Sequence, residues 1–168
     1  VDSERGVYVL NDENFEEVVD TENPMLIEFY APWCEECRFL TQKMEDTVKL
    51  LDKSKLNSVM VAKVEVESSP KLVETFNITG IPTVYLYRPS KGLIEYEIEV
   101  HAKHLLLWIE KHVTGKLREY DTVEEIMRYQ EEYDVIALGL FSNNQSIPYK
   151  TYTELGLTDH GYTYAVCF

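Results

Sequence analysis

Short apolar segments alternate with polar ones along the chain, and they predict a series of strands. Residues 25–30 are apolar except for Glu28, and residues 58–66 are almost continuously apolar, which is typical of a central strand covered on both faces. Asn23 and Pro24 break the chain before the first of these strands. Before Gly115, strands are predicted at residues 7–10, 25–30, 58–66, 83–87 and 93–100.

Apolar residues at helical spacing lie between these strands. The longest series includes Phe39, Met44 and Leu51, and it predicts a helix over residues 34–51. Further helices are predicted from Phe15 after the capping side chains of residues 11–14, from Pro70 to Phe76, and over residues 102–112 before Gly115.

After Gly115 the same alternation begins again. Strands are predicted at residues 117–120, 134–141 and 162–168, with helices at 123–129 and 149–155. Cys167 lies in the last apolar run, where we expect a small buried hydrophobic residue. If its thiol were exposed, it could form an intermolecular disulfide.

Two cysteines separated by two residues follow the strand at 25–30. Cys34 is expected at a helix N-terminus, where unpaired backbone N–H groups and the positive end of the dipole favour its thiolate. Cys37 lies on the same face, so the pair can close a disulfide and reopen it through a mixed disulfide with a partner. A zinc-ligand pair and an inert disulfide are the alternatives, and only His101-x-x-His104, expected far from the cysteines, supports zinc.

Residues 28–37, Glu-Phe-Tyr-Ala-Pro-Trp-Cys-x-x-Cys, and residues 80–83, Gly-Ile-Pro-Thr, resemble the catalytic domain of protein disulfide isomerases within the thioredoxin superfamily. The resemblance covers roughly residues 5–116 and implies an α/β thioredoxin fold, a mixed sheet sandwiched by helices. It implies a catalytic domain at residues 1–116. Residues 117–168 resemble the N-terminal part of a non-catalytic thioredoxin-like domain, an incomplete βαβαβ unit.

The resemblance assigns Cys34 as the nucleophile and Cys37 as the resolving thiol, with no metal or organic cofactor. Glu28 matches a buried acid that deprotonates the resolving cysteine through water, and burial would raise its pKa. Lys63 matches a lysine that pairs with this acid. From the residues alone, Glu28 could equally be an outward-facing polar residue of an alternating strand. The alternative for Lys63 is an ordinary lysine at an exposed strand position.

Four further residues are expected at the substrate site. Pro82 matches a cis-proline that faces the dithiol and leaves the backbone of Ile81 free to pair with an extended peptide, with a trans turn proline as the alternative. Trp33 and Tyr30 would form an apolar rim that receives unfolded chains, unless they are simple core residues.

The chain departs from the isomerase pattern at three places. Glu35 and Glu36 stand where isomerases usually have Gly-His, and their carboxylates should raise the pKa of Cys34 and make the disulfide a weaker oxidant. An arginine that assists the resolving cysteine in isomerases is replaced by Val100, and the adjacent His101 could partly substitute for it. A kinking proline is replaced by Gln42, which predicts a straighter helix.

Charge and composition restrict the partners. Sixteen basic and thirty acidic residues among 168 give a net charge of −14, which argues against nucleic acid or an anionic membrane surface. No apolar run is long enough to span a bilayer, and residues 1–5 lack the pattern of a signal peptide, which does not decide the compartment. The resemblance implies the lumen of the endoplasmic reticulum, unfolded or misoxidised protein substrates, and glutathione or an upstream oxidase.

The sequence therefore predicts a thiol-disulfide oxidoreductase or isomerase for folding secretory proteins, biased toward reduction. The alternative is a redox-slow chaperone or escort module that traps partners as mixed disulfides, which Glu35, Glu36 and Val100 motivate. A cytosolic thioredoxin-like reductase is a lesser alternative, because thioredoxins more often have an aspartate in place of Glu28 and a different strand pattern around Lys63.

Overall fold

The structure is a computed structural model that describes residues 1–19, 22–89, 91–97, 102–130, 136–159 and 163–168. By its packing the chain divides into two compact units, Val1–Ala102 and Lys103–Phe168. The predicted domain boundary after residue 116 stays a prediction.

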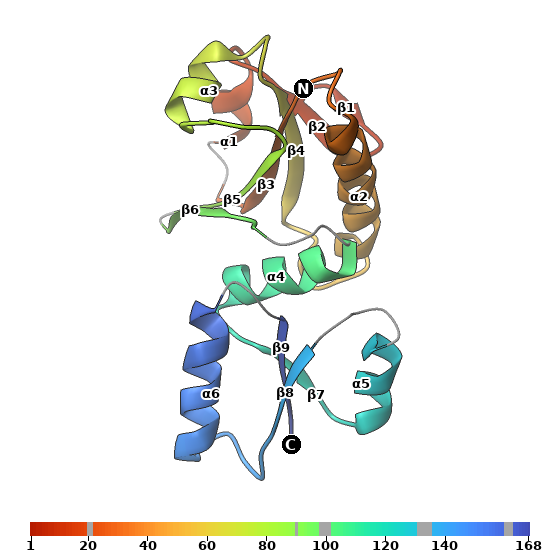
Figure 1. Cartoon of the computed structure of the whole chain (residues 1–168), viewed down its shortest axis with the longest axis vertical. Coiled ribbons are helices and arrows are strands. Elements are labelled where there is room, and N and C mark those ends of the chain that lie inside the picture. The colour runs from red at the N-terminus through yellow and green to blue at the C-terminus, as the bar shows by residue number, and fades with distance from the viewer. Residues whose placement is uncertain (20–21, 90, 98–101, 131–135, 160–162) are drawn as a thin grey trace. The chain divides into compact units, whose positions relative to one another are not determined.

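A six-stranded mixed sheet forms the centre of the first unit. Its strands are β1 (Ser3–Glu4), β2 (Val7–Leu10), β3 (Met25–Tyr30), β4 (Met60–Glu65), β5 (Thr83–Arg88) and β6 (Gly92–Glu95), in the order β1-β2-β4-β3-β5-β6. Its helices are α1 (Phe15–Val19), α2 (Glu35–Leu51) and α3 (Pro70–Thr75). Helices α1 and α3 lie on one side of the sheet and α2 on the other (Figure 1).

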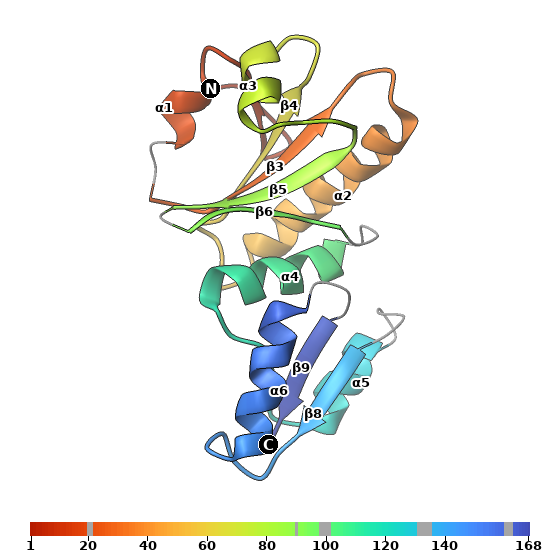
Figure 2. The same cartoon turned by 60° about the vertical axis from the view of Figure 1, so that its left-hand side comes forward.

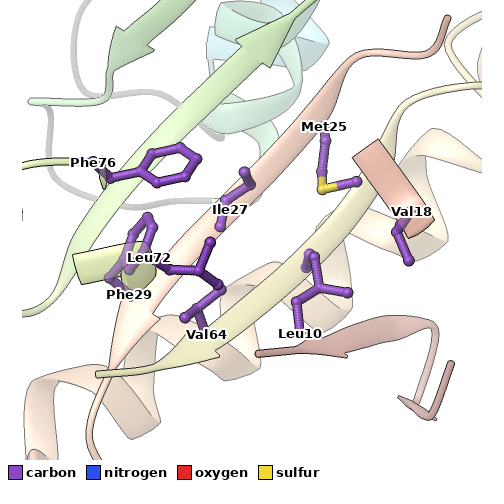
Figure 3. Packing of buried hydrophobic residues seen from close by; sticks show 9 residues of the cluster. Leu10, Val18, Met25, Ile27, Phe29, Val64, Leu72 and Phe76 are labelled. Carbon is purple, nitrogen blue, oxygen red and sulfur yellow. The ribbon is translucent and has the colours of Figure 1, made fainter. Parts of the chain in front are cut away.

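Successive side chains of β3 point to opposite faces of the sheet. Met25, Ile27 and Phe29 belong to the core cluster on the side of α1 and α3, where the ring centroids of Phe29 and Phe76 are 5.1 Å apart (Figure 3). Successive strand side chains point to opposite faces, so Glu28 points to the side of α2. The central strand is therefore buried on both faces, as its apolar run predicts.

Helix α2 starts at the dithiol. Cys34 is its N-cap residue, and the helix continues without interruption past Gln42 to Leu51. The helix turns one face to the protein interior, with buried residues Cys37, Leu40, Met44, Thr47 and Leu51. The predicted helix over residues 34–51 is thus confirmed.

The sequence did not predict strand β1. It pairs antiparallel with β2 through a two-residue turn in which Arg5 and Gly6 have φ values of 50° and 85°. The two-residue hairpin turn whose twist matches that of the flanking strands requires positive φ at both central residues. Gly6 also lies close to α2, because a Cβ at this position would come within 2.8 Å of Val48 Cγ1. We call residues 3–10 the N-terminal hairpin.

The second unit contains a three-stranded parallel sheet. Its strands are β7 (Arg118–Tyr120), β8 (Ile136–Leu140) and β9 (Thr163–Cys167), in the order β7-β9-β8. Its helices are α4 (Ala102–Thr114), α5 (Val123–Gln130) and α6 (Ile147–Thr158), and α5 and α6 lie on opposite faces of the sheet (Figures 1 and 2). Cys167 is a free cysteine with 6% exposure, as predicted. Both units thus follow the predicted alternation of strands and helices, although the described β6 ends at Glu95.

We expect Gly6→Ala to lower the free energy of unfolding by about 1–2 kcal/mol, because alanine is strained at this φ and its methyl group would meet Val48. Urea unfolding followed by circular dichroism measures this change. Gly92→Ala is the matched control, since Gly92 also has a positive φ of 79° but no neighbouring atom lies within 4 Å of the position of its Cβ. Equal stabilities of the two variants would contradict the tight contact between hairpin and helix.

Candidate active site

The two cysteines of the motif form a disulfide at the start of α2. Their Cα atoms are 5.2 Å apart, and the backbone N–H of Cys37 donates a hydrogen bond to Cys34 Sγ at 3.1 Å. Cys34 is 4% exposed and Cys37 is 0% exposed, so Cys34 is the more accessible sulfur. A hydrogen bond from a helix N-terminus would stabilise the thiolate of Cys34 once the pair is reduced.

Apolar side chains from three elements surround the dithiol. Cys34 and Cys37 cluster with Ala31, and the partly buried side chains of Tyr30, Val66 and Ile81 pack against them. The peptide bond between Ile81 and Pro82 is cis, as predicted. Tyr30 and Ile81 are therefore brought to the cysteines, as the sequence leads one to expect.

Trp33 lies beside Cys34 but is not part of the core. Its side chain is 69% exposed, and its indole Nε1 donates a hydrogen bond to Glu67 Oε1 at 2.7 Å. An exposed aromatic ring held in one orientation is suited to contact a partner chain.

Glu28 is fully buried under α2. It is 0% exposed, and Thr41 Oγ1 donates a hydrogen bond to its Oε2 at 2.8 Å. Burial raises the pKa of Glu28 to about 7, although the Thr41 hydrogen bond and the positive charge of Lys63 both lower it. Thr41 follows Cys37 by four residues on α2, so both side chains lie on one face of the helix.

Lys63 is the strand neighbour of Glu28 but makes its ion pair elsewhere. The two residues are Cα partners in the parallel β3–β4 ladder. Among the described residues, however, the Lys63 ammonium pairs with Glu4 Oε2 at 2.6 Å. It also lies 5.3 Å from the ring centroid of Tyr30. The expected ion pair between Lys63 and Glu28 is therefore not formed, and only a Coulomb attraction acts between these strand neighbours. The N-terminal hairpin supplies the competing carboxylate, Glu4.

A groove of about 600 Å³ opens beside this group. Its walls come from the N-terminal hairpin, the end of β3 with the loop that follows it, α2 and β4. The lining residues are Glu4, Arg5, Tyr30, Ala31, Pro32, Arg38, Thr41, Glu45 and Lys63.

The remaining predicted site residues lie at the helix start or outside the described residues. Glu35 and Glu36 are exposed in the first turn of α2. Val100 and His101 lie outside the described residues. Among those that are described, no group of three or more His, Cys, Asp or Glu side chains could hold a metal ion, and no helix is long and apolar enough to cross a membrane.

Comparison with known families decides the relationship. The Thioredoxin family model matches residues 6–111. The chain belongs to the thioredoxin family. In this thioredoxin-family chain the matched region includes the dithiol, Glu28, Lys63 and most of α4.

Several relatives of the chain are named protein disulfide isomerases. Protein disulfide-isomerase 1 of Caenorhabditis elegans is 29% identical over 154 residues, which cover 92% of this chain and 31% of the worm protein. The first thioredoxin domain of mouse Protein disulfide-isomerase A4 is 29% identical with a TM-score of 0.60, and the match covers 66% of this chain and 78% of that domain. The predicted resemblance and the predicted thioredoxin fold are therefore confirmed.

A further solved structure matches both units. A crystal structure of human ERp44 covers 100% of this chain and 45% of its own chain at 20% identity and a TM-score of 0.61, which shows the fold alone. This thioredoxin-family chain spans less than a third of the length of the worm isomerase.

Sequence reasoning missed two polar residues of the site. Thr41 could have been found, since it stands one helical turn after Cys37. Glu4 had a weaker signal in the Arg5-Gly6 dipeptide, which is compatible with a hairpin turn before residues 7–10.

The raised pKa of Glu28 predicts a pH-dependent stability. Below about pH 4.5 this carboxyl is protonated in both states, whereas at higher pH the unfolded chain releases its proton first and the folded chain only near pH 7. As the pH rises from about 4.5 to about 7, we expect the unfolding free energy of the wild type to fall by about 3 kcal/mol relative to that of Glu28→Gln. Urea unfolding at several pH values measures the difference, with the exposed Glu16→Gln as control. Parallel curves for the wild type and Glu28→Gln would contradict the raised pKa.

Proposed function

We propose that this chain exchanges thiols and disulfides with cysteines of folding secretory proteins, with a bias toward reduction. The observation that carries the proposal is the Cys34–Cys37 pair at the start of α2, beside a buried carboxyl whose pKa is about 7. The similarity to isomerase relatives supports a protein substrate.

The first step uses Cys34 of the reduced form. Its thiolate attacks one sulfur of a substrate disulfide, so a Cys34–substrate disulfide forms while the substrate S–S bond breaks. The leaving substrate sulfur takes up a proton. Trp33, Tyr30 and Ile81 would hold the substrate chain, because they lie around the cysteine that is more accessible.

The second step uses Cys37 and Glu28. The Cys37 thiol gives its proton to the Glu28 carboxylate through water, and the resulting thiolate attacks Cys34 Sγ. The Cys34–Cys37 bond forms while the Cys34–substrate bond breaks, and the substrate sulfur leaves as a thiolate that takes up a proton. Over the two steps the substrate disulfide has gained two electrons and become two thiols, and the Cys34–Cys37 dithiol has become a disulfide. A pKa near 7 suits this role, since the carboxyl can then accept and release a proton near neutral pH.

Two thiols of glutathione would return the chain to its dithiol form and become glutathione disulfide. An upstream oxidase would drive the cycle in the opposite direction. The relatives support the lumen of the endoplasmic reticulum as the compartment. The chain's own cysteine chemistry requires no metal or organic cofactor.

The direction of exchange depends on Glu35 and Glu36. Their carboxylates repel the thiolate of Cys34 and raise the pKa of its thiol. The reduced form is therefore less stable, relative to the disulfide, than it would be with Gly-His between the cysteines. The potential should therefore lie toward about −270 mV, that of thioredoxin, and away from about −180 mV, that of an isomerase.

An insulin assay separates catalysis from trapping by an escort module. We expect a single turnover of the reduced wild type to release reduced insulin, because Cys37 resolves the mixed disulfide. Cys37→Ser should accumulate the covalent adduct, and Cys34→Ser should form none. Non-reducing gels and product release measure both outcomes. An adduct that persists in the wild type would favour the trap.

The two glutamates can be tested through the reduction potential. We expect Glu35→Gln combined with Glu36→Gln to raise the potential by about 30–60 mV and to lower the pKa of Cys34, since both carboxylates oppose its thiolate. Equilibration in glutathione buffers and thiolate absorbance measure the two quantities. Glu16→Gln with Glu17→Gln makes the same charge change in the first turn of α1. If the two double variants shifted the reduction potential equally, a local effect of Glu35 and Glu36 on Cys34 would be excluded.

A further inference from the structure

Lys63 lies between two carboxylates on the α2 side of the first sheet. Strand β4, which carries Lys63, has β3 with Glu28 on one side and β2 on the other, and β1 with Glu4 lies beyond β2. The ammonium pairs with Glu4 at 2.6 Å although the Cα partner of Lys63 on β3 is Glu28.

One oxygen of the buried acid remains available. Glu28 Oε2 accepts the hydrogen bond of Thr41, whereas Oε1 is buried and has no hydrogen-bond partner among the described residues. A buried carboxylate normally draws an adjacent ammonium, because the pair lowers the cost of removing both charges from water. The pairing of Lys63 with Glu4 instead needs a cause.

The N-terminal hairpin supplies that cause. Arg5 pairs with Glu45 of α2 at 2.9 Å, and Gly6 lies against Val48 of the same helix. These two contacts, with the β1–β2 pairing, place Glu4 within reach of the ammonium. The side chain of Glu4 is 65% exposed, so this carboxylate keeps most of its hydration while it binds Lys63.

We infer that Glu4 is a positioning residue for the proposed dithiol chemistry: it holds the Lys63 ammonium away from Glu28 and leaves Glu28 Oε1 free to exchange a proton. This inference rests on the proposed function of Glu28. Without Glu4, Lys63 would turn to Glu28 and keep it ionised at neutral pH.

Several charged or titratable groups lie on the elements around the Glu28 carboxyl. Val84, the strand neighbour of Glu28 on β5, is apolar. The charged or titratable groups on the other elements are Glu4 and Arg5 of the hairpin, Arg38 and Glu45 of α2, Lys63 and Glu65 of β4, Tyr30 of β3, and the dithiol. Of these, Lys63 is the one whose charge lowers the pKa of Glu28.

The decisive variant is Glu4→Gln. We expect the midpoint of Glu28 ionisation to fall from about 7 by about one pH unit or more, since a carboxylate that gains an adjacent cation titrates lower. Carbon-13 NMR of the oxidised full chain with labelled glutamate carboxyls measures the midpoint, and Glu28→Gln assigns the signal. An unchanged midpoint would overturn the inference.

Two controls separate the ion pair from general charge effects. Glu65→Gln removes a carboxylate from the strand that carries Lys63, but it leaves the hairpin contacts and the Lys63–Glu4 pair in place, so we expect a much smaller shift. In a Lys63→Met background, Glu4→Gln should have little effect, because no ammonium remains to move. Equal shifts in Glu4→Gln and Glu65→Gln, or equal effects of Glu4→Gln with and without Lys63→Met, would overturn the inference.

The pH profile of the second exchange step gives the functional readout. We expect the rise in rate with pH to move to lower pH in Glu4→Gln, by the same shift as the NMR midpoint. If the midpoint moves and the rate profile does not, Glu4 positions Lys63 but Glu28 is not the proton acceptor. The test therefore distinguishes failure of this inference from failure of the proposed function.

Discussion

The first unit depends on the burial of one carboxyl in the middle of its sheet. Such a group is tolerated when it is neutral or accepts hydrogen bonds, and Glu28 accepts one from Thr41. Since Thr41 belongs to α2, the helix must pack with one particular face toward β3 for this bond to form. Cys37 lies on that face one turn earlier, so the packing that satisfies the acid also sets the position of the resolving sulfur.

The charges near the dithiol oppose one another. The chain carries a net charge of −14, yet Arg5, Arg38 and Lys63 all line the groove beside α2. Arg38 follows Cys37 directly and is exposed, whereas Glu35 and Glu36 lie between the two cysteines. The helix dipole and the cations favour a thiolate, and the two carboxylates disfavour it. We expect the reduction potential of the pair to reflect this balance, in which Glu35 and Glu36 are the two opposing charges.

Local patterns predicted the elements, and long-range geometry determined the contacts between them. Strands β3 and β4 are visible in the sequence because their residues are apolar or β-branched, and α2 is visible from its helical spacing. Strand β1 is two exposed residues with no apolar pattern, and it forms because Arg5 and Gly6 adopt positive φ.

In the site, too, the sequence predicted the local features but not a contact between distant segments. The cysteine pair, the cis bond before Pro82 and the buried position of Glu28 agree with expectation. The partner of Lys63 did not follow from the sequence, since Glu4 lies 59 residues away and meets it only through the order of the strands. Pairings of this kind require the assembled sheet.

The family model begins at residue 6, and Glu4 lies before it. The ion pair therefore joins a residue inside the matched region, Lys63, to a segment that lies outside it. The two residues of β1 are exposed and fill no interior space, so this strand can accept substitutions that the packed sheet cannot. Natural variation or protein engineering at this margin would then adjust the acid–base behaviour of the interior while leaving the cysteines and the hydrophobic core untouched.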